Sequence, residues 1–326
     1  MQGKIGLEEH FAIPETLGDS AGFLSPDCWE TLSRRLIDIH EERLREMDAH
    51  GMELMILSLN APTVQAVADT AAAVDLARRA NDFLAEQVAR RPDRFQGFAA
   101  LPLQDPEAAA LELRRCMRDL GFRGALVNGF SQVTRGSGVA YYDHPDYLPF
   151  WAEVEALDAP FYLHPRNPLA QDSRIYDGCG WLMGPTWAFG QETAVHALRL
   201  MGSGLFDRHP NLKIVLGHLG EGLPYSMWRV DNRNAWTKAA PAYPAQHPIG
   251  HYFSRNFWLT TSGNFRTQSL VDAMLELGSD RLLFSTDWPF EAVSDACTWF
   301  DACSISENDR LKIGRTNAQA LFKLGS

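Results

Sequence analysis

Acidic and imidazole side chains stand together near the start of the chain, in the stretch KIGLEEHFAIPE. Glu8, Glu9 and His10 follow a short apolar run there. Alternate residues of a β-strand point to opposite faces, so Glu8 and His10 are expected on one face and Glu9 on the other. A carboxylate and an imidazole are ligand types that bind divalent metal ions. The spacing therefore predicts half of a metal site, and we expect Glu9 to make a structural contact.

Comparable residues end other apolar runs further along the chain. His164 ends PFYLH, His218 follows KIVLG with Glu221 three residues later, and Asp287 follows LLFST. Charged side chains in core strands are rarely buried without a partner. Two carboxylates and two imidazoles directed at one point would hold a divalent cation and leave a position open for water or substrate. The candidates at strand ends are Glu8, His10, His164, His218 and Asp287, with Glu221 close to His218.

The elements that must position these residues alternate between strand-like and helical patterns. Eight apolar runs are interpreted as strands, and most are too apolar to have one face in water, which is typical of parallel sheets. They span residues 4–10, 52–60, 95–103, 124–130, 160–165, 213–220, 257–263 and 282–289. Helical spacing is found in residues 36–47 with Gly51 as a stop, and in residues 66–90, 105–120 and 186–203.

Eight βα units predict an α/β fold, a (β/α)8 TIM barrel that forms a single domain over residues 1–326. The carboxyl ends of the strands in such a barrel meet at one face, where catalytic residues lie. A doubly wound sheet is the alternative, but no GxGxxG pattern follows the first strand. The extra length is expected as loop insertions and a C-terminal helix, at 11–33, 166–185, 236–256 and about 306–323.

Composition argues against several classes of partner. The formal net charge is −11, so no basic surplus exists to displace counterions from nucleic acid or to bind an anionic membrane. No run reaches the roughly 18 apolar residues of a membrane span, and the N-terminus lacks the layout of a signal peptide. The five cysteines are scattered, with no CxxC pattern. We expect reduced thiols and a cytoplasmic protein.

Simpler interpretations exist for each candidate ligand taken alone. A single strand-end histidine is more often a satisfied core residue, and Asp287 before Trp288 and Pro289 could cap a turn. Convergence of four such groups under one fold favours metal binding. None of the five lysines ends a predicted strand, so a carboxylated lysine bridging two metals is not expected. Strand four ends near Asn128 instead, and a mononuclear site is the better prediction.

Several long stretches resemble the metal-dependent decarboxylase branch of the amidohydrolase superfamily, over nearly the whole chain. Most of that superfamily opens with His-x-His, whereas the Glu-x-His of this chain fits the decarboxylase branch. The stretches are GKIGLEEHFAIPETLGDSAGF, ILSLNAP, GALVNGFSQ, FYLHPRNPLAQDSRIYDG, LGHLGEGLPYSMWRVDNRN, TTSGNFRTQ and LLFSTDWPFE.

The resemblance implies non-oxidative, reversible decarboxylation of a hydroxybenzoate, most closely of 2,6-dihydroxybenzoate to resorcinol and CO2, in the catabolism of aromatic compounds. It implies one zinc or manganese ion per subunit, no organic cofactor, and a homotetramer. The metal ligands that it implies are Glu8, His10, His164 and Asp287. It also implies that Phe23, Asn128 and Arg229 hold the substrate. The simpler interpretation of Phe23 is an aromatic side chain that packs on the rim of the barrel, and that of Arg229 is a surface ion pair.

The reaction needs a proton donor beside the carboxyl-bearing ring carbon, because an aryl anion is too costly to form. Asp287 is the expected donor, with His218 and Glu221 orienting the substrate or relaying the proton. The choice of donor between Asp287 and His218 stays open.

Two other functions also stay open. One is a metal-dependent hydrolase or hydratase that acts on a lactone or an aromatic ring-cleavage product. The other is a non-catalytic barrel with a closed, structural metal.

Overall fold

The computed structural model describes residues 1–134, 136–237 and 242–325, except for the side chain of Phe23. Eight parallel strands form its centre, and each begins within or close to a run predicted from the sequence. They are β1 (Lys4–Phe11), β2 (Met52–Leu59), β3 (Phe95–Gly97), β4 (Ala125–Asn128), β7 (Pro160–His164), β8 (Lys213–Leu216), β9 (Phe257–Thr260) and β10 (Leu282–Leu283). A short antiparallel pair, β5 (Ser131–Gln132) and β6 (Val139–Ala140), follows β4.

Backbone hydrogen bonds join these strands into a barrel with two irregular seams. The regular ladders run β1-β2-β3 and β10-β9-β8-β7-β4. A parallel bridge between Ala99 and Ala125 joins the two sets. At the other seam, the Asp287 N–H donates to the Glu8 carbonyl at 3.0 Å, and the His10 N–H donates to the Trp288 carbonyl at 2.6 Å. The predicted (β/α)8 barrel is confirmed, although regular strand pairing is interrupted at both seams.

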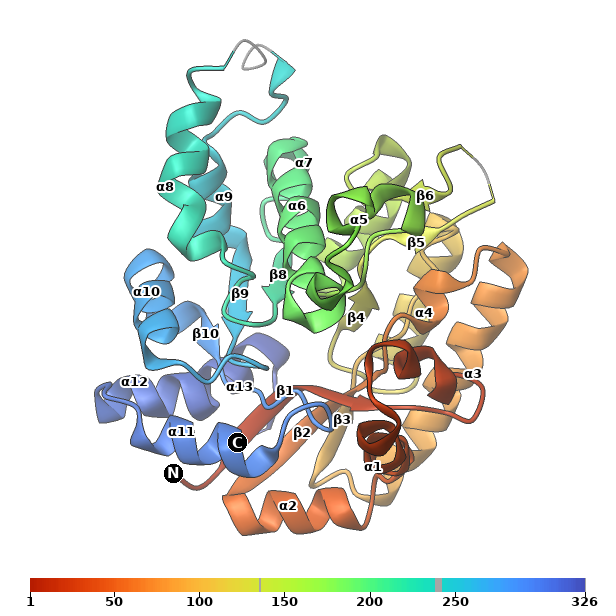
Figure 1. The fold of residues 1–326 in the computed structure, drawn as a ribbon, viewed down its shortest axis with the longest axis vertical. Helices are drawn as coiled ribbons and strands as arrows, with labels where there is room; N and C mark the ends of the chain where they lie inside the picture. The colour runs from red at the N-terminus through yellow and green to blue at the C-terminus, as the bar shows by residue number, and fades with distance from the viewer. Residues whose placement is uncertain (135, 238–241, 326) are drawn as a thin grey trace.

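Helices surround the strands (Figure 1). They are α1 (Pro26–Ile37), α2 (Glu42–His50), α3 (Thr70–Arg90), α4 (Pro106–Arg118), α5 (Leu148–Ala156), α6 (Ala188–Gly202), α7 (Leu205–Arg208), α8 (Leu223–Asn234), α9 (Ile249–Asn256), α10 (Thr267–Leu277), α11 (Val293–Ala302), α12 (Glu307–Leu311) and α13 (Asn317–Phe322). Short 3-10 turns occupy much of the 166–185 insertion, and α8 and α9 pack together as an arm beyond the barrel (Figure 1). Within the described residues, every helix is too short or too polar to cross a lipid bilayer.

Two predicted helices are divided in the structure. The pattern over residues 36–47 belongs to α1 and α2, because Asp38 leaves the helical conformation and ends α1, while its side chain binds the start of α2. Its carboxylate accepts from the backbone N–H groups of Glu41 and Arg43, both at 3.0 Å. Gly51 ends α2 with φ of 69°, as the sequence predicts. The C-terminal helix consists of α12, a π-helical turn (Lys312–Thr316) and α13.

The barrel interior carries an apolar layer with a polar layer above it. A buried cluster includes Ile56 of β2, Leu126 of β4 and Tyr162 of β7, and α13 contributes Ala318 and Phe322 to it. Two residues further along each of these strands, on the same face, stand Ser58, Asn128 and His164. The polar layer therefore lies at the carboxyl ends of the strands, while apolar packing fills the barrel beneath it.

Burial of His196 in α6 should make folding sensitive to acid. The ring accepts a hydrogen bond from the Tyr142 N–H at 3.3 Å, and burial, assisted by the nearby charge of Arg199, lowers its pKa to about 3. The unfolded chain binds the proton near pH 6.5, so stability is lost as pH falls below that value. Between pH 8 and pH 5 the wild-type protein should lose about 2 kcal/mol more unfolding free energy than His196→Gln. Urea unfolding at both pH values tests this, and parallel losses would contradict it.

Candidate metal centre and active site

Four predicted ligands meet at the carboxyl-terminal mouth of the barrel. Glu8 and His10 come from β1, His164 ends β7, and Asp287 lies four residues beyond β10. One potential ligand atom from each lies within 4.8 Å of the others. The His164 Nε2–Glu8 Oε1 distance is 3.2 Å, and the His10 Nε2–Asp287 Oδ1 distance is 3.4 Å. The structure thus brings together all four residues that the family resemblance implies as ligands.

Unpartnered atoms inside this cluster fit a cation. Glu8 and His10 are fully buried, yet Glu8 Oε1 and His10 Nε2 have no hydrogen-bond partner among the described residues. Buried polar atoms are normally paired, so an unpaired carboxylate oxygen facing an unpaired imidazole nitrogen is a feature to explain. Burial also lowers the pKa of His164 against the opposing charge of Glu8, which favours the neutral imidazole that binds metals. The residues present therefore fit a divalent metal ion.

A bulge in β1 places both ligands of that strand inside the barrel. Gly6 pairs with Met55 and Glu9 with Leu57, so three steps along β1 match two steps along β2. Ile5 and Leu7 belong to the interior apolar cluster. If side chains simply alternated along β1 from Ile5 and Leu7, Glu8 and His10 would point out of the barrel. The one extra residue of the bulge reverses the alternation, so both side chains point into the barrel.

Glu9 makes the structural contact that its position predicts. Its carboxylate faces away from the cluster and accepts from the Thr286 N–H at 2.9 Å and the Ser285 hydroxyl at 3.0 Å. Burial raises its pKa to about 7 despite these donors and the charge of Arg43. These bonds hold the segment before Asp287, whose φ of 73° directs its side chain into the mouth.

His218 and Glu221 form a hydrogen-bonded pair on the turn after β8. His218 Nδ1 lies 2.7 Å from Glu221 Oε1, and His218 Nε2 lies 3.6 Å from both Asp287 Oδ2 and Glu8 Oε1. Burial opposes the charged imidazole, but the charges of Glu221 and Glu8 outweigh it and raise the His218 pKa well above its usual value. The pair is therefore suited to hold or pass a proton beside the cluster.

A cavity of about 890 Å³ opens directly over these groups. His218, Glu221 and Asp287 line it, and Trp187 and Phe189 add aromatic surface. Sequence reasoning did not select the two aromatic residues, because a Trp and a Phe inside an insertion have no spacing that indicates a site. The combination of polar groups and aromatic walls is typical of a small-molecule site.

The three predicted substrate-binding residues differ in their placement. Asn128 is buried at the end of β4, where it pairs in register with His164, and its Oδ1 has no partner among the described atoms. Phe23 ends the 3-10 helix Leu17–Phe23, but its side chain lies outside the described part. Arg229 lies on α8 with an exposed side chain and does not line the cavity. The role of each stays a prediction.

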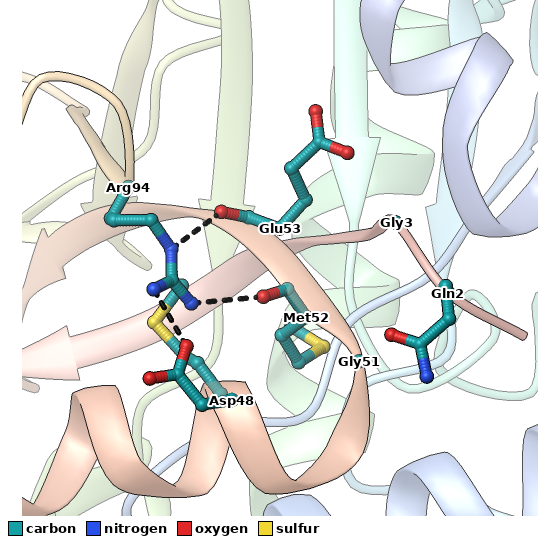
Figure 2. Close-up of a pocket in the computed structure, with 8 residues that line it drawn as sticks. Gln2, Gly3, Asp48, Gly51, Met52, Glu53 and Arg94 are labelled. Atoms are coloured by element: carbon teal, nitrogen blue, oxygen red, sulfur yellow. Dashed lines mark hydrogen bonds and ion pairs between the residues drawn. The ribbon is translucent and has the colours of Figure 1, made fainter.

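A second pocket, of about 420 Å³, lies at the opposite end of β1 and β2 (Figure 2). The guanidinium of Arg94, which lines this pocket, already has acceptors. It donates to the Glu53 carbonyl at 3.0 Å, to Asp48 Oδ1 at 2.7 Å and to the Met52 carbonyl at 3.1 Å. These bonds tie α2 to the start of β2. We interpret this pocket as structural, because its cation is already satisfied.

Comparison with known proteins agrees with the fold and with the family resemblance of the sequence. A family model described as Amidohydrolase matches residues 13–324. The chain belongs to the amidohydrolase family. This amidohydrolase is 69% identical over 324 residues to the gamma-resorcylate decarboxylase of Rhizobium radiobacter, a match that covers 99% of each chain. The resemblance to the decarboxylase branch is thereby confirmed.

Two solved structures superpose closely on this amidohydrolase. One is 2,6-dihydroxybenzoate decarboxylase complexed with 2,6-dihydroxybenzoate, with a TM-score of 0.97, 69% identity, and coverage of 99% of this chain and 100% of that chain. The other is a dihydroxybenzoic acid decarboxylase from Polaromonas sp. JS666 with bound manganese and the inhibitor 2-nitroresorcinol. It has a TM-score of 0.97 and 68% identity, and covers 99% of this chain and 97% of that chain.

Loss of one imidazole should empty the metal centre of this amidohydrolase. His164→Ala removes a ligand from a buried cluster that includes two carboxylates, so metal content should fall to a small fraction of one ion per chain. His144→Ala removes an exposed histidine and is the control. Elemental analysis of dialysed protein measures both, and full occupancy in His164→Ala would contradict the predicted ligand set.

Proposed function

We propose that this protein catalyses the non-oxidative, reversible decarboxylation of 2,6-dihydroxybenzoate to resorcinol and CO2. One observation carries the proposal: the Glu8, His10, His164 and Asp287 cluster lies beside the His218–Glu221 pair at a cavity of about 890 Å³. The full-length similarity to a gamma-resorcylate decarboxylase supports the choice of reaction. The structure solved with 2,6-dihydroxybenzoate supports the choice of substrate.

The proposed cofactor is one zinc or manganese ion per subunit, held by Glu8, His10, His164 and Asp287. Imidazole and carboxylate ligands suit either metal, and the manganese in the Polaromonas structure supports the second. When bound, the ion would supply electrostatic stabilisation to the carboxylate and an ortho hydroxyl oxygen of the substrate. No organic cofactor is required by the chemistry proposed.

The protein's own residues would supply the proton. Asp287 is the proposed donor to the ring carbon that bears the carboxyl group, and His218 is positioned to restore its proton. Protonation forms a carbon–hydrogen bond and interrupts aromaticity. The bond to the carboxylate carbon then breaks, its electron pair returns to the ring, and CO2 leaves. Glu221 would keep the His218 ring in orientation through the 2.7 Å contact.

Substrate binding is proposed for Asn128, Phe23 and Arg229. Asn128 supports this with an unpartnered carbonyl oxygen beside His164. The Arg229 side chain is exposed and does not line the cavity of its own chain. This supports the proposal that Arg229 contacts the substrate bound in a neighbouring subunit.

A homotetramer is the proposed assembly. Two large aromatic side chains of α8 are exposed, Tyr225 at 87% and Trp228 at 73%. Exposed aromatic patches of this kind often mark protein contacts. We also propose that residues 1–326 form one domain, that the enzyme is cytoplasmic, and that it acts in the catabolism of aromatic compounds.

A direct assay tests the function. Metal-loaded enzyme incubated with 2,6-dihydroxybenzoate without oxygen should form resorcinol, and a chelator should stop the reaction until metal is returned. Product identity is checked by chromatography and by the ultraviolet spectrum. Failure to convert 2,6-dihydroxybenzoate, 2,3-dihydroxybenzoate or salicylate, in protein shown to contain metal, would favour the hydrolase or hydratase alternative.

Replacement of the proposed acid should remove activity. Asp287→Asn cannot donate the required proton, so kcat should fall by about 10²-fold or more. Metal content is measured alongside, because Asp287 is also a proposed ligand. Asp295→Asn makes the same charge change at an exposed residue of α11 and is the matched control. Near-normal turnover of metal-loaded Asp287→Asn would remove Asp287 from the mechanism.

A further inference from the structure

Three hydroxyl groups gather around one oxygen of Glu8 inside the barrel. The Tyr162 hydroxyl donates to Glu8 Oε2, and the Ser262 hydroxyl donates to the same oxygen at 2.6 Å. Thr260 Oγ1 lies 2.6 Å from the Tyr162 oxygen and 2.9 Å from the Ser262 oxygen. All three side chains are buried. We call Tyr162, Thr260 and Ser262 the hydroxyl cluster.

The number of hydroxyl protons sets the donor-to-acceptor direction of the hydrogen bonds in the cluster. Each hydroxyl has one proton, and those of Tyr162 and Ser262 are both given to Glu8. The Thr260 proton is then free for the nearer oxygen, that of Tyr162. The Ser262 oxygen accepts instead from the His218 backbone N–H at 3.2 Å. Every donor in the cluster therefore points, directly or through one neighbour, toward Glu8 Oε2.

The two oxygens of Glu8 consequently differ in their surroundings. Oε2 accepts two hydrogen bonds, and a Cβ atom added to Gly217 would lie 2.6 Å from it, so this side of the carboxylate is closely packed. Oε1 has no hydrogen-bond partner among the described residues and faces the imidazoles of His164 and His218 at 3.2 and 3.6 Å.

We propose that the hydroxyl cluster positions Glu8 to bind the metal through Oε1 alone, and that it thereby sets the affinity of the site. The terminal torsion of a glutamate is soft, so an unrestrained carboxylate could turn either or both oxygens toward the cation. Hydrogen bonds to a charged acceptor are strong enough to hold its plane. Groups that orient a metal ligand in this way commonly change metal affinity by about 10–100-fold. The inference rests on the proposed metal centre and deepens it.

The chain contains a matched pair of tyrosines for the test. Tyr142, like Tyr162, is fully buried, and its hydroxyl also has two polar neighbours, the Gly129 carbonyl at 2.6 Å and Ser131 Oγ at 3.0 Å. Both Tyr→Phe changes remove one buried hydroxyl, but only Tyr162→Phe removes a donor to Glu8. A general loss of stability would therefore affect both variants, whereas a positioning role would affect only one.

The measurement is the Kd for Mn²⁺ of full-length, metal-free protein without substrate, from the paramagnetic resonance signal of free Mn²⁺. We expect Tyr162→Phe to bind about 10–100-fold more weakly than wild type and Tyr142→Phe to bind as wild type does. Thr260→Val, which is nearly isosteric, should weaken binding by a smaller factor. Thr260→Ser, which keeps the hydroxyl, should restore it. The Thr260 pair carries the test if Tyr162→Phe does not fold.

Equal Kd values for Tyr162→Phe and Tyr142→Phe would overturn the positioning role, and so would equal values for Thr260→Val and Thr260→Ser. These results would leave the metal centre intact, because wild-type protein would still bind Mn²⁺. Absence of binding in wild type would overturn the metal centre itself, and this inference with it. Catalytic activity enters none of these measurements, so failure of the proposed reaction is recognised separately by the resorcinol assay.

Discussion

Burial of the Glu8 carboxylate is the constraint on which the rest of the site depends. Its side chain has no exposure to solvent, and burial alone would favour the neutral acid. The positive charge of His218 is the largest influence that outweighs burial and lowers its pKa. One oxygen is satisfied by hydroxyl donors and the other faces imidazoles, so the carboxylate stays ionised in a dry environment. A buried anion arranged in this way is prepared for a cation, and removal of its partners would leave an uncompensated charge.

The barrel makes this arrangement possible because apolar side chains and polar side chains occupy different levels along each strand. Apolar side chains such as Ile56 and Leu126 fill the interior below, and polar side chains two residues later form the mouth. The same seam that closes the barrel also carries the site: the Asp287 N–H bonds to the Glu8 carbonyl, and Glu9 holds Ser285 and Thr286. Distortion of the seam would therefore change the distance between two proposed ligands.

The left-handed backbone at His218, Glu221 and Asp287, with φ of 51°, 56° and 73°, shows where this region departs from regular structure. Non-glycine residues adopt such angles rarely, and they persist where surrounding contacts over-determine them. Here the contacts are the His218–Glu221 bond and the bonds of Asp287 and its neighbours to β1. Irregular backbone at the strand ends is thus part of how side chains from β1, β8 and β10 come to face one another.

The sequence by itself indicated where the strands begin and that they run parallel, because long apolar runs are local signals, although β3 and β10 are shorter than their runs. The set Glu8, His10, His164 and Asp287 followed from the resemblance to a known family. The sequence also separated Glu9 from Glu8 and His10 correctly. It did not indicate the β1 bulge, the division of helix 36–47 at Asp38, or the role of Tyr162, Thr260 and Ser262 around Glu8. A tyrosine, a threonine and a serine in apolar strands resemble ordinary core residues. Only the tertiary structure, which brings residues about 100 to 250 positions apart into hydrogen-bonding distance, decides that their protons converge on one carboxylate oxygen.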